Sequence, residues 1–251
     1  MTVFAALTRA SIKANTRDAV TIFFTFAFPL VFLVIFGLIF RGQKVVETGN
    51  GYIDFIAPGL LSWGLANAAS FGVSFTLMQW RRDDLLRLIR LTPARLSEVV
   101  LSRLVIAAII GLAQCLLFIG VATIPLFGMH VSGRWPLALP MMLLGVTTFL
   151  GLGLIIGAVS NTPEAVSAIG NCVVIPMAFL SGSFIPVELM PEWLRTVSNA
   201  MPMRHLLDGL VYALAGAGEA RDYGIACLVL AGFTIVFTGI GLRMFRWSNN
   251  V

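Results

Sequence analysis

The chain has 251 residues, of which 58% are hydrophobic and only 12% are charged, and its mean hydropathy is +0.93. A soluble domain usually carries about 25% charged residues, so this composition excludes an ordinary globular protein and indicates a polytopic membrane protein. The length accommodates one hydrophobic unit and leaves no room for a separate soluble catalytic domain. The net charge of +5 does not predict a nucleic-acid partner, because cytoplasmic loops of membrane proteins carry excess Lys and Arg anyway.

Residues 1–17 place Arg9, Lys13 and Arg17 on one side of a helix and apolar residues on another. This pattern predicts an amphipathic helix lying in the headgroup interface. It is either an elbow helix that steers the first span or a basic flank that sets topology. The apolar run that follows is longer than the roughly 7–15 residues of a signal-peptide core, so no cleaved signal peptide is expected.

Six apolar segments reach about the 20 residues that a helical span requires. Their expected limits are 19–40, 55–79, 104–126, 136–159, 165–183 and 223–242. The expected fold is therefore all-α and integral to the membrane, with six transmembrane helices in a single domain. In the fourth segment, Gly153 and Gly157 have the four-residue spacing that favours close helix contact in membranes.

A dense charge cluster lies between the second and third spans, at residues 80–103. Two aspartates precede Arg87 by four and three positions, a spacing that stabilises a helix through side-chain pairing. Thr92 and Pro93 are typical of an N-cap followed by proline in the first helical turn, and Thr162 and Pro163 repeat this pattern before the fifth span. We therefore expect one short helix over 80–91 and a new helix from Pro93. The cluster is either a docking segment for a partner or a solvated loop that sets topology.

The stretch 180–210 is apolar but contains no uninterrupted run of spanning length, because prolines break it at Pro186, Pro191 and Pro202. Short amphipathic helices that dip back into the membrane are expected over 184–205, an arrangement tolerated where protein buries the backbone. The small residues at 209–220 predict a linker before the last span.

An even number of spans places both termini on one side of the membrane. That side carries about 11 basic residues and the opposite side 6, so the positive-inside rule places the termini and the charged cluster in the cytoplasm. The segment 184–205 is then external.

The sequence contains no GxxxxGK[ST] phosphate-binding loop, so we expect no enzymatic activity in this chain and no cofactor. His130 and His205 lack a neighbouring cysteine or carboxylate cluster, so no metal site is expected. The run from Ser181 to Ser183 lacks the G-x-S-x-G frame of a serine hydrolase and predicts a flexible turn.

All 12 acidic residues fall in loops or at span edges. Carriers coupled to protons or sodium usually need ionisable groups at mid-membrane. If this protein transports a substrate, the energy is therefore expected to arrive from outside the membrane core. The charged cluster at 80–103 is the natural place for it to arrive.

Over essentially its whole length the chain resembles the permease subunits of type-two ABC exporters, particularly the daunorubicin-resistance-type drug permeases. The resemblance is sharpest at 171–208, where the family shows an SG-x-F-x-P turn, a P-x-W-L step and a later proline. The matching residues are Ser181, Gly182, Phe184, Pro186, Pro191, Trp193, Leu194 and Pro202.

The resemblance implies a multi-pass permease of the bacterial inner membrane, paired with an identical or similar permease above two ATP-binding subunits that hold ATP and Mg. It implies a coupling helix at 80–91 and an external gate at 184–205. The coupling residues expected are Arg81, Arg82, Asp83, Asp84, Arg87 and Arg90. The gate residues expected are Phe184, Pro186, Glu188, Pro191, Trp193 and Pro202.

The leading interpretation is an efflux permease for a hydrophobic or amphipathic compound, such as a drug, an antibiotic or a lipid-like molecule. Its path is expected along aromatic side chains: Phe24, Phe28, Phe32, Trp63, Phe71 and Phe179. One alternative is an ABC exporter of a polysaccharide or lipid-linked glycan, which predicts a continuous channel of aromatic and polar side chains. Another is a membrane scaffold or integral enzyme that transports nothing.

Overall fold

A computed structural model describes residues 19–40, 51–83 and 96–244 of the chain. The long helices are α2 (Ala19–Ile39), α3 (Tyr52–Arg82), α5 (Leu96–Ala122), α6 (Ala138–Val159), α7 (Pro163–Leu180) and α10 (Ala220–Met244). The shorter elements are η1 (Trp135–Leu137), η2 (Val187–Leu189), α8 (Glu192–Asn199) and α9 (Pro202–Leu214). The interface helix expected at 1–17 and residues 84–91 of the expected coupling helix lie outside the described residues.

Within the described ranges, five helical segments are long and apolar enough to cross a membrane. They are Tyr52–Arg82, Leu101–Ala122, Trp135–Val159, Pro163–Leu180 and Ala220–Met244. In α2 the part with described side chains from Thr25 to Ile39 is shorter than a span, so the crossing expected at 19–40 stays a prediction. The predicted all-helical membrane class is confirmed, and the count of six spans stays a prediction.

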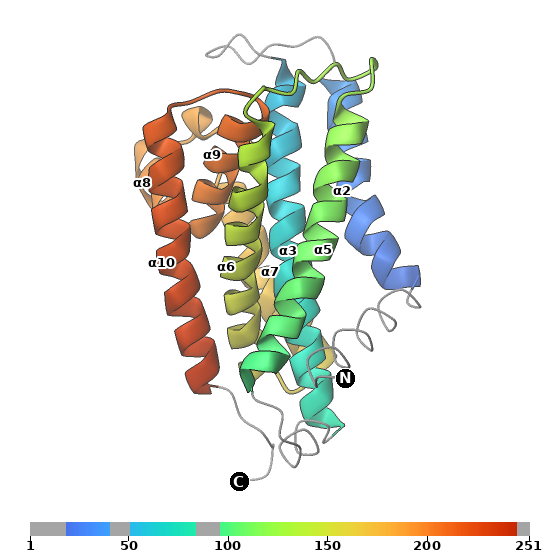
Figure 1. Ribbon diagram of the computed structural model, residues 1–251, viewed down its shortest axis with the longest axis vertical. Coiled ribbons are helices and arrows are strands. Elements are labelled where there is room, and N and C mark those ends of the chain that lie inside the picture. Colours follow the sequence, from blue (N-terminus) through green and yellow to red (C-terminus); the bar gives the residue numbers. More distant parts are fainter. Residues whose placement is uncertain (1–18, 41–50, 84–95, 245–251) are drawn as a thin grey trace.

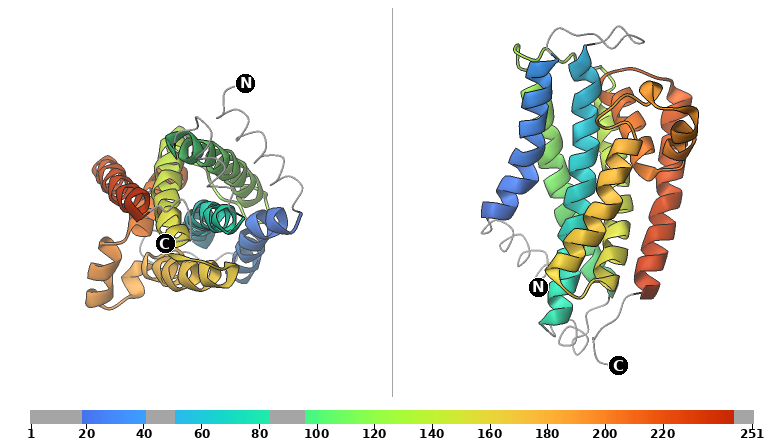
Figure 2. Two further views of the ribbon diagram at one scale, coloured as in Figure 1. Left: turned by 90° about the horizontal axis from the view of Figure 1, so that it is seen from below. Right: turned by 180° about the vertical axis from the view of Figure 1, so that it is seen from behind.

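Helix α3 lies at the centre of the bundle (Figures 1 and 2). Seen along the bundle, α2, α5, α6 and α7 surround it (Figure 2, left), and α9 also contacts it. Helix α10 packs against α6 and α9. Every residue of α3 from Ile56 to Ala66 is buried, because small side chains let neighbouring helices approach closely. These small residues are Ala57, Gly59, Ser62, Gly64 and Ala66.

Helices α3 and α6 meet along a seam of small residues. A Cβ atom at Gly153 of α6 would collide with the carbonyl oxygen of Ser70, and Gly157 lies against Ser74. The Ser70 hydroxyl donates a hydrogen bond to Phe149 O at 3.0 Å, and the Ser74 hydroxyl donates to Gly153 O at 2.8 Å. The predicted close helix contact at this glycine pair is therefore confirmed, and serine hydroxyls bond across it.

Replacing Gly153 by leucine is expected to destabilise the permease by about 1–3 kcal/mol, because the added side chain must force α3 and α6 apart. The measurement is the thermal-unfolding temperature of the purified protein in detergent. Gly120→Leu on α5 is the matched control, since a Cβ there meets nothing within 4 Å. Equal destabilisation by the two substitutions would contradict the packing role of Gly153.

A hydrogen bond near Pro29 links α2 to α5. Because proline has no N–H, the carbonyl oxygen four residues earlier, Thr25 O, lacks its helical partner. Gln114 Nε2 on α5 donates to this oxygen at 2.8 Å, and the Gln114 side chain is buried. A buried amide thus satisfies the carbonyl that the proline releases, as a helix in a membrane requires.

Helix α7 begins at Pro163, as the sequence predicts, and the Thr162 hydroxyl accepts a hydrogen bond from Ala165 N at 3.2 Å. It ends at Leu180, short of the upper end of α3 (Figure 2, right). The chain then forms η2 and α8, and α9 leads to the end of the bundle where α10 begins (Figure 1).

The linker predicted at 209–220 is wrong in its first half, because α9 continues to Leu214. A Cβ atom at Gly209 would collide with the Met141 side chain of α6. The glycine therefore serves close packing of two helices rather than chain flexibility. The turn itself lies at Gly216 and Gly218, whose φ angles are 71° and 94°.

Candidate functional site

Five aromatic rings from α2, α3, α7 and the turn after α7 contact one another. We name this group the aromatic cluster: Phe28, Phe32, Trp63, Phe179 and Phe184. Trp63 is its hub, with ring centroids 5.9 Å from Phe28, 5.9 Å from Phe32 and 5.3 Å from Phe184. Phe179 lies 5.0 Å from Phe184. These separations are those of favourable aromatic pairs.

The aromatic cluster has a buried centre and an exposed edge. Trp63 is 9% exposed, whereas Phe28 and Phe179 are 43% and 48% exposed. Within the described residues, the Trp63 indole Nε1–H has no hydrogen-bond acceptor although it is buried. An unpaired buried donor of this kind costs about 1–3 kcal/mol. The cluster therefore offers apolar contact area together with one unused hydrogen-bond donor.

Four of the six expected path residues lie in the aromatic cluster: Phe28, Phe32, Trp63 and Phe179. Phe71 lies two turns further along α3 and is not part of the cluster. Its ring stacks on Phe75 at a centroid distance of 6.0 Å and packs against Gly170 of α7. The side chain of Phe24 lies outside the described residues.

Next to the aromatic cluster, the turn after α7 is held against α3 by serine hydroxyls. Ser183 Oγ shares hydrogen bonds with Ser62 Oγ at 3.2 Å and with Ser181 Oγ at 3.0 Å. All three serines are buried, and a Cβ atom at Gly59 would collide with Ser183 O. Gly182 takes a φ of 93°, which favours glycine. The predicted flexible turn is therefore wrong: it is packed and hydrogen-bonded.

The expected gate residues do not gather at one place in the structure. Phe184 belongs to the aromatic cluster, and Pro202 is buried as the first residue of α9. Pro186 precedes η2 and Pro191 precedes α8, while the Trp193 side chain is 67% exposed on α8. The side chain of Glu188 lies outside the described residues.

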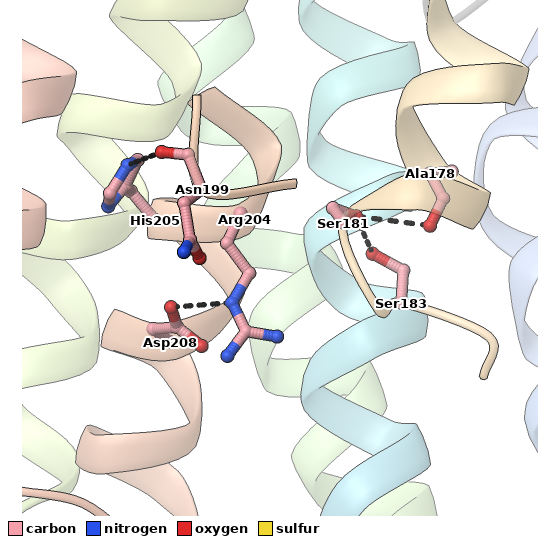
Figure 3. A network of polar contacts seen from close by, with 7 residues as sticks. All are labelled: Ala178, Ser181, Ser183, Asn199, Arg204, His205 and Asp208. Atoms are coloured by element: carbon pink, nitrogen blue, oxygen red, sulfur yellow. Dashed lines mark hydrogen bonds and ion pairs between the residues drawn. The ribbon is translucent and has the colours of Figure 1, made fainter. Parts of the chain in front are cut away.

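Helix α9 carries an ion pair that the sequence analysis did not single out. Arg204 Nε donates to Asp208 Oδ2 at 2.9 Å, and both side chains are partly exposed (Figure 3). The spacing in the sequence could have predicted this pair, because opposite charges four residues apart pair on a helix. One residue along, His205 Nε2 lies 2.9 Å from Asn199 O, so the first turn of α9 is tied to the end of α8 (Figure 3).

Near the C-terminal end of α3, Arg81 is 6% exposed, and its side chain reaches the last turn of α6. Its guanidinium donates to Gly157 O and Ala158 O at 2.9 Å each, and also to Ser160 O. These oxygens belong to the carbonyls that a helix end leaves without intrahelical donors, and a cation there also complements the helix dipole. The sequence placed Arg81 in a charged segment, but nothing in the pattern revealed this contact.

The remaining coupling residues are solvent-facing or undescribed. Arg82 and Asp83 are exposed at the end of α3, and Gln79 Nε2 donates to Asp83 Oδ2 at 2.8 Å. Asp84, Arg87 and Arg90 lie outside the described residues. Residues 80–82 belong to the last turn of α3 itself.

Within the described ranges, five apolar helices are long enough to cross a membrane, and one of them, α3, is the buried centre of the bundle. These helices define a multi-pass membrane protein. Residues 2–215 match the ABC-2 type transporter family, and the chain belongs to this family. The resemblance to type-two ABC exporter permeases seen in the sequence is therefore confirmed.

Three relatives illustrate the similarity. Daunorubicin resistance ABC transporter permease protein DrrB1 of Streptomyces coeruleorubidus is 27% identical over 227 residues, covering 88% of this chain and 78% of that protein. Linearmycin resistance permease protein LnrN of Bacillus subtilis is 28% identical over 121 residues, covering 48% of this chain and 31% of that protein. Inner membrane transport permease YadH of Escherichia coli is 25% identical over 232 residues, covering 85% and 86% of the two chains.

Proposed function

We propose that this chain is the permease subunit of an ATP-driven exporter that moves a hydrophobic or amphipathic compound out of the cytoplasm or the inner leaflet. The observation that carries the proposal is the aromatic cluster. It combines exposed ring surface at Phe28 and Phe179 with a buried, unpaired indole N–H at Trp63. Apolar and aromatic side chains with a few polar groups are typical of small-molecule sites. Two relatives named for antibiotic resistance support this substrate class.

ATP and Mg would be held by separate nucleotide-binding subunits, since the chain has no phosphate-binding loop. A second permease, identical or similar, would complete the membrane part in a bacterial inner membrane. The segment 80–91 would dock on the nucleotide-binding subunit, with both termini cytoplasmic. In support of a shared side for this segment and the C-terminus, the last residues of α3 and α10 lie at the same end of the bundle (Figure 1).

Movement of the docking segment would reach the rest of the bundle through Arg81. This side chain belongs to the last turn of α3 and bonds the last turn of α6, from which the chain turns directly into α7. At the far end, the segment 184–205 would act as the outer gate. Phe184 joins this segment to the aromatic cluster, so a gate movement would change the surface offered to substrate.

The test is reconstitution of the permease with its nucleotide-binding subunit in liposomes, followed by ATPase assays across hydrophobic drugs, lipids and lipid-linked glycans. Stimulation by drugs or lipids is expected. Stimulation by glycans alone would replace the proposed substrate class, and no stimulation by any compound would favour a protein that transports nothing.

The coupling role has its own prediction in the same liposomes. Reversing the charge at Arg87 and Arg90 together, with glutamate, is expected to weaken binding of the nucleotide-binding subunit and abolish stimulated transport. The reason is that opposite charges across an interface guide docking, and reversed charges repel. Arg221→Glu, at an exposed position in the first turn of α10, is the control. Unchanged binding and transport in the double variant would refute the coupling segment.

A further inference from the structure

A small hollow of about 30 Å³ opens between α3, α5 and α6, away from the aromatic cluster. Its walls are small or apolar: Ala68 and Gly72 on α3, Ala107 and Ile110 on α5, and Leu150 on α6. Gly72 is exposed, and a Cβ atom there would meet nothing within 4 Å. The hollow is therefore open to the surroundings of the bundle along the α3 side.

Arg103 stands at one end of this hollow and lines it. Its guanidinium carbon lies 4.4 Å from the centre of the Trp80 ring, so the cation rests on an aromatic face. Its Nε–H is buried and has no hydrogen-bond partner within the described residues, and no carboxylate there forms an ion pair with it. Trp80 attracts the cation but supplies neither a negative charge nor a hydrogen-bond acceptor.

The position of Arg103 in the span defines the direction of the hollow. Arg103 lies about two turns from Leu96 of α5 and rests on Trp80, which is two residues from the end of α3, so it belongs to this end of the bundle. Tryptophan and arginine side chains near the ends of spans favour the headgroup interface. From Arg103 the lining residues of α5 continue to Ile110, a rise of about 10 Å toward the middle of the bundle. A cation beside a small apolar hollow matches the headgroup and the adjoining part of an acyl chain of an anionic amphiphile.

We propose that this groove binds an anionic phospholipid of the leaflet surrounding the Arg103 end of the bundle. The phosphate accepts hydrogen bonds from the Arg103 guanidinium, including the unused Nε–H. One acyl chain lies over Ala68 and Gly72. In the orientation proposed above this leaflet is the cytoplasmic one, but lipid binding does not depend on the transported substrate.

The experiment measures lipid binding to the purified permease in a neutral detergent by native mass spectrometry, with thermal unfolding in parallel. Dioleoylphosphatidylglycerol is expected to bind about fivefold more tightly than dioleoylphosphatidylcholine, the effect of roughly 1 kcal/mol for one basic residue at a membrane surface. Arg103→Gln is expected to remove this preference, and Arg103→Lys to retain most of it. Arg82→Gln, at an exposed arginine near the end of α3, is expected to leave it unchanged.

The acyl-chain half of the proposal is tested separately. Gly72→Leu fills the hollow and is expected to weaken binding of both lipids, whereas Gly120→Leu, equally open on α5, is expected to have no effect. Equal binding of the two lipids by the unaltered protein, or an equal loss with Arg82→Gln, would overturn the site. Inorganic phosphate that protects against unfolding as well as phosphatidylglycerol would show a simple anion site and would overturn the acyl-chain groove.

Discussion

Replacing Arg81 by methionine is expected to lower the thermal-unfolding temperature of the purified permease by roughly 6–12 °C. Methionine can fill the space of the arginine stem but cannot donate to the Gly157, Ala158 and Ser160 carbonyl oxygens. Each buried carbonyl left without a donor costs about 1–3 kcal/mol, so the loss of three bonds is expected to exceed about 3 kcal/mol. The measurement is a thermal melt in detergent.

The same variant is expected to uncouple ATP hydrolysis from transport, because α3 would no longer hold the end of α6. Arg81→Lys keeps the charge near the helix end but makes fewer bonds, so an intermediate melt is expected. Arg221→Met is the control, since this arginine is exposed on α10 and lies outside the docking segment. If Arg81→Met melted and transported like Arg221→Met, the anchoring role would be wrong.

Trp63→Phe is expected to separate stability from transport. Phenylalanine preserves most of the ring contacts with Phe32 and Phe184 but removes the buried N–H that has no acceptor. Removing an unsatisfied donor is expected to leave stability unchanged or raise it by up to about 1 kcal/mol. Transport of a compound that accepts this hydrogen bond is expected to fall by about 2–12-fold, from a net bond energy of roughly 0.5–1.5 kcal/mol.

The substitution is read out by a thermal melt and by drug-stimulated transport in liposomes. Trp63→Ala is expected to lose about 3–5 kcal/mol of stability, because it removes the hub of the aromatic cluster. Trp135→Phe, at a half-exposed tryptophan in η1, serves as the control. Transport by Trp63→Phe at the level of this control, for every stimulating compound, would exclude the indole N–H from the substrate path.

Several local features followed from the sequence because they rest on short-range chemistry. The start of α7 at Pro163 could be predicted from the Thr162 hydroxyl and the missing proline N–H, which are both properties of the local sequence. The close contact at Gly153 needed only the spacing of small residues on a helix. The family followed in the same way, from the pattern at 171–208.

Other features depended on contacts between distant parts of the chain, which no spacing in the sequence reveals. The Ser181–Ser183 turn looked flexible because its residues are small and polar. It is packed because Ser62 and Gly59, more than a hundred residues earlier, contact it from α3. A linker was predicted at Gly209 for a similar reason. This glycine instead lies within α9 and packs against Met141 of α6. A glycine permits both flexibility and close packing, and only the neighbour decides between them.

By itself, the sequence determined that this protein is an all-helical membrane protein of the ABC-2 type transporter family, because hydrophobic length and local motifs are properties of the chain alone. The tertiary structure decided what the polar and aromatic side chains do. It turned Arg81 from one charge in a cluster into the anchor of α6, and it gathered four expected path residues, Trp63 among them, in the aromatic cluster. In a membrane, buried polar groups must find partners within the protein, and those partners lie on other helices.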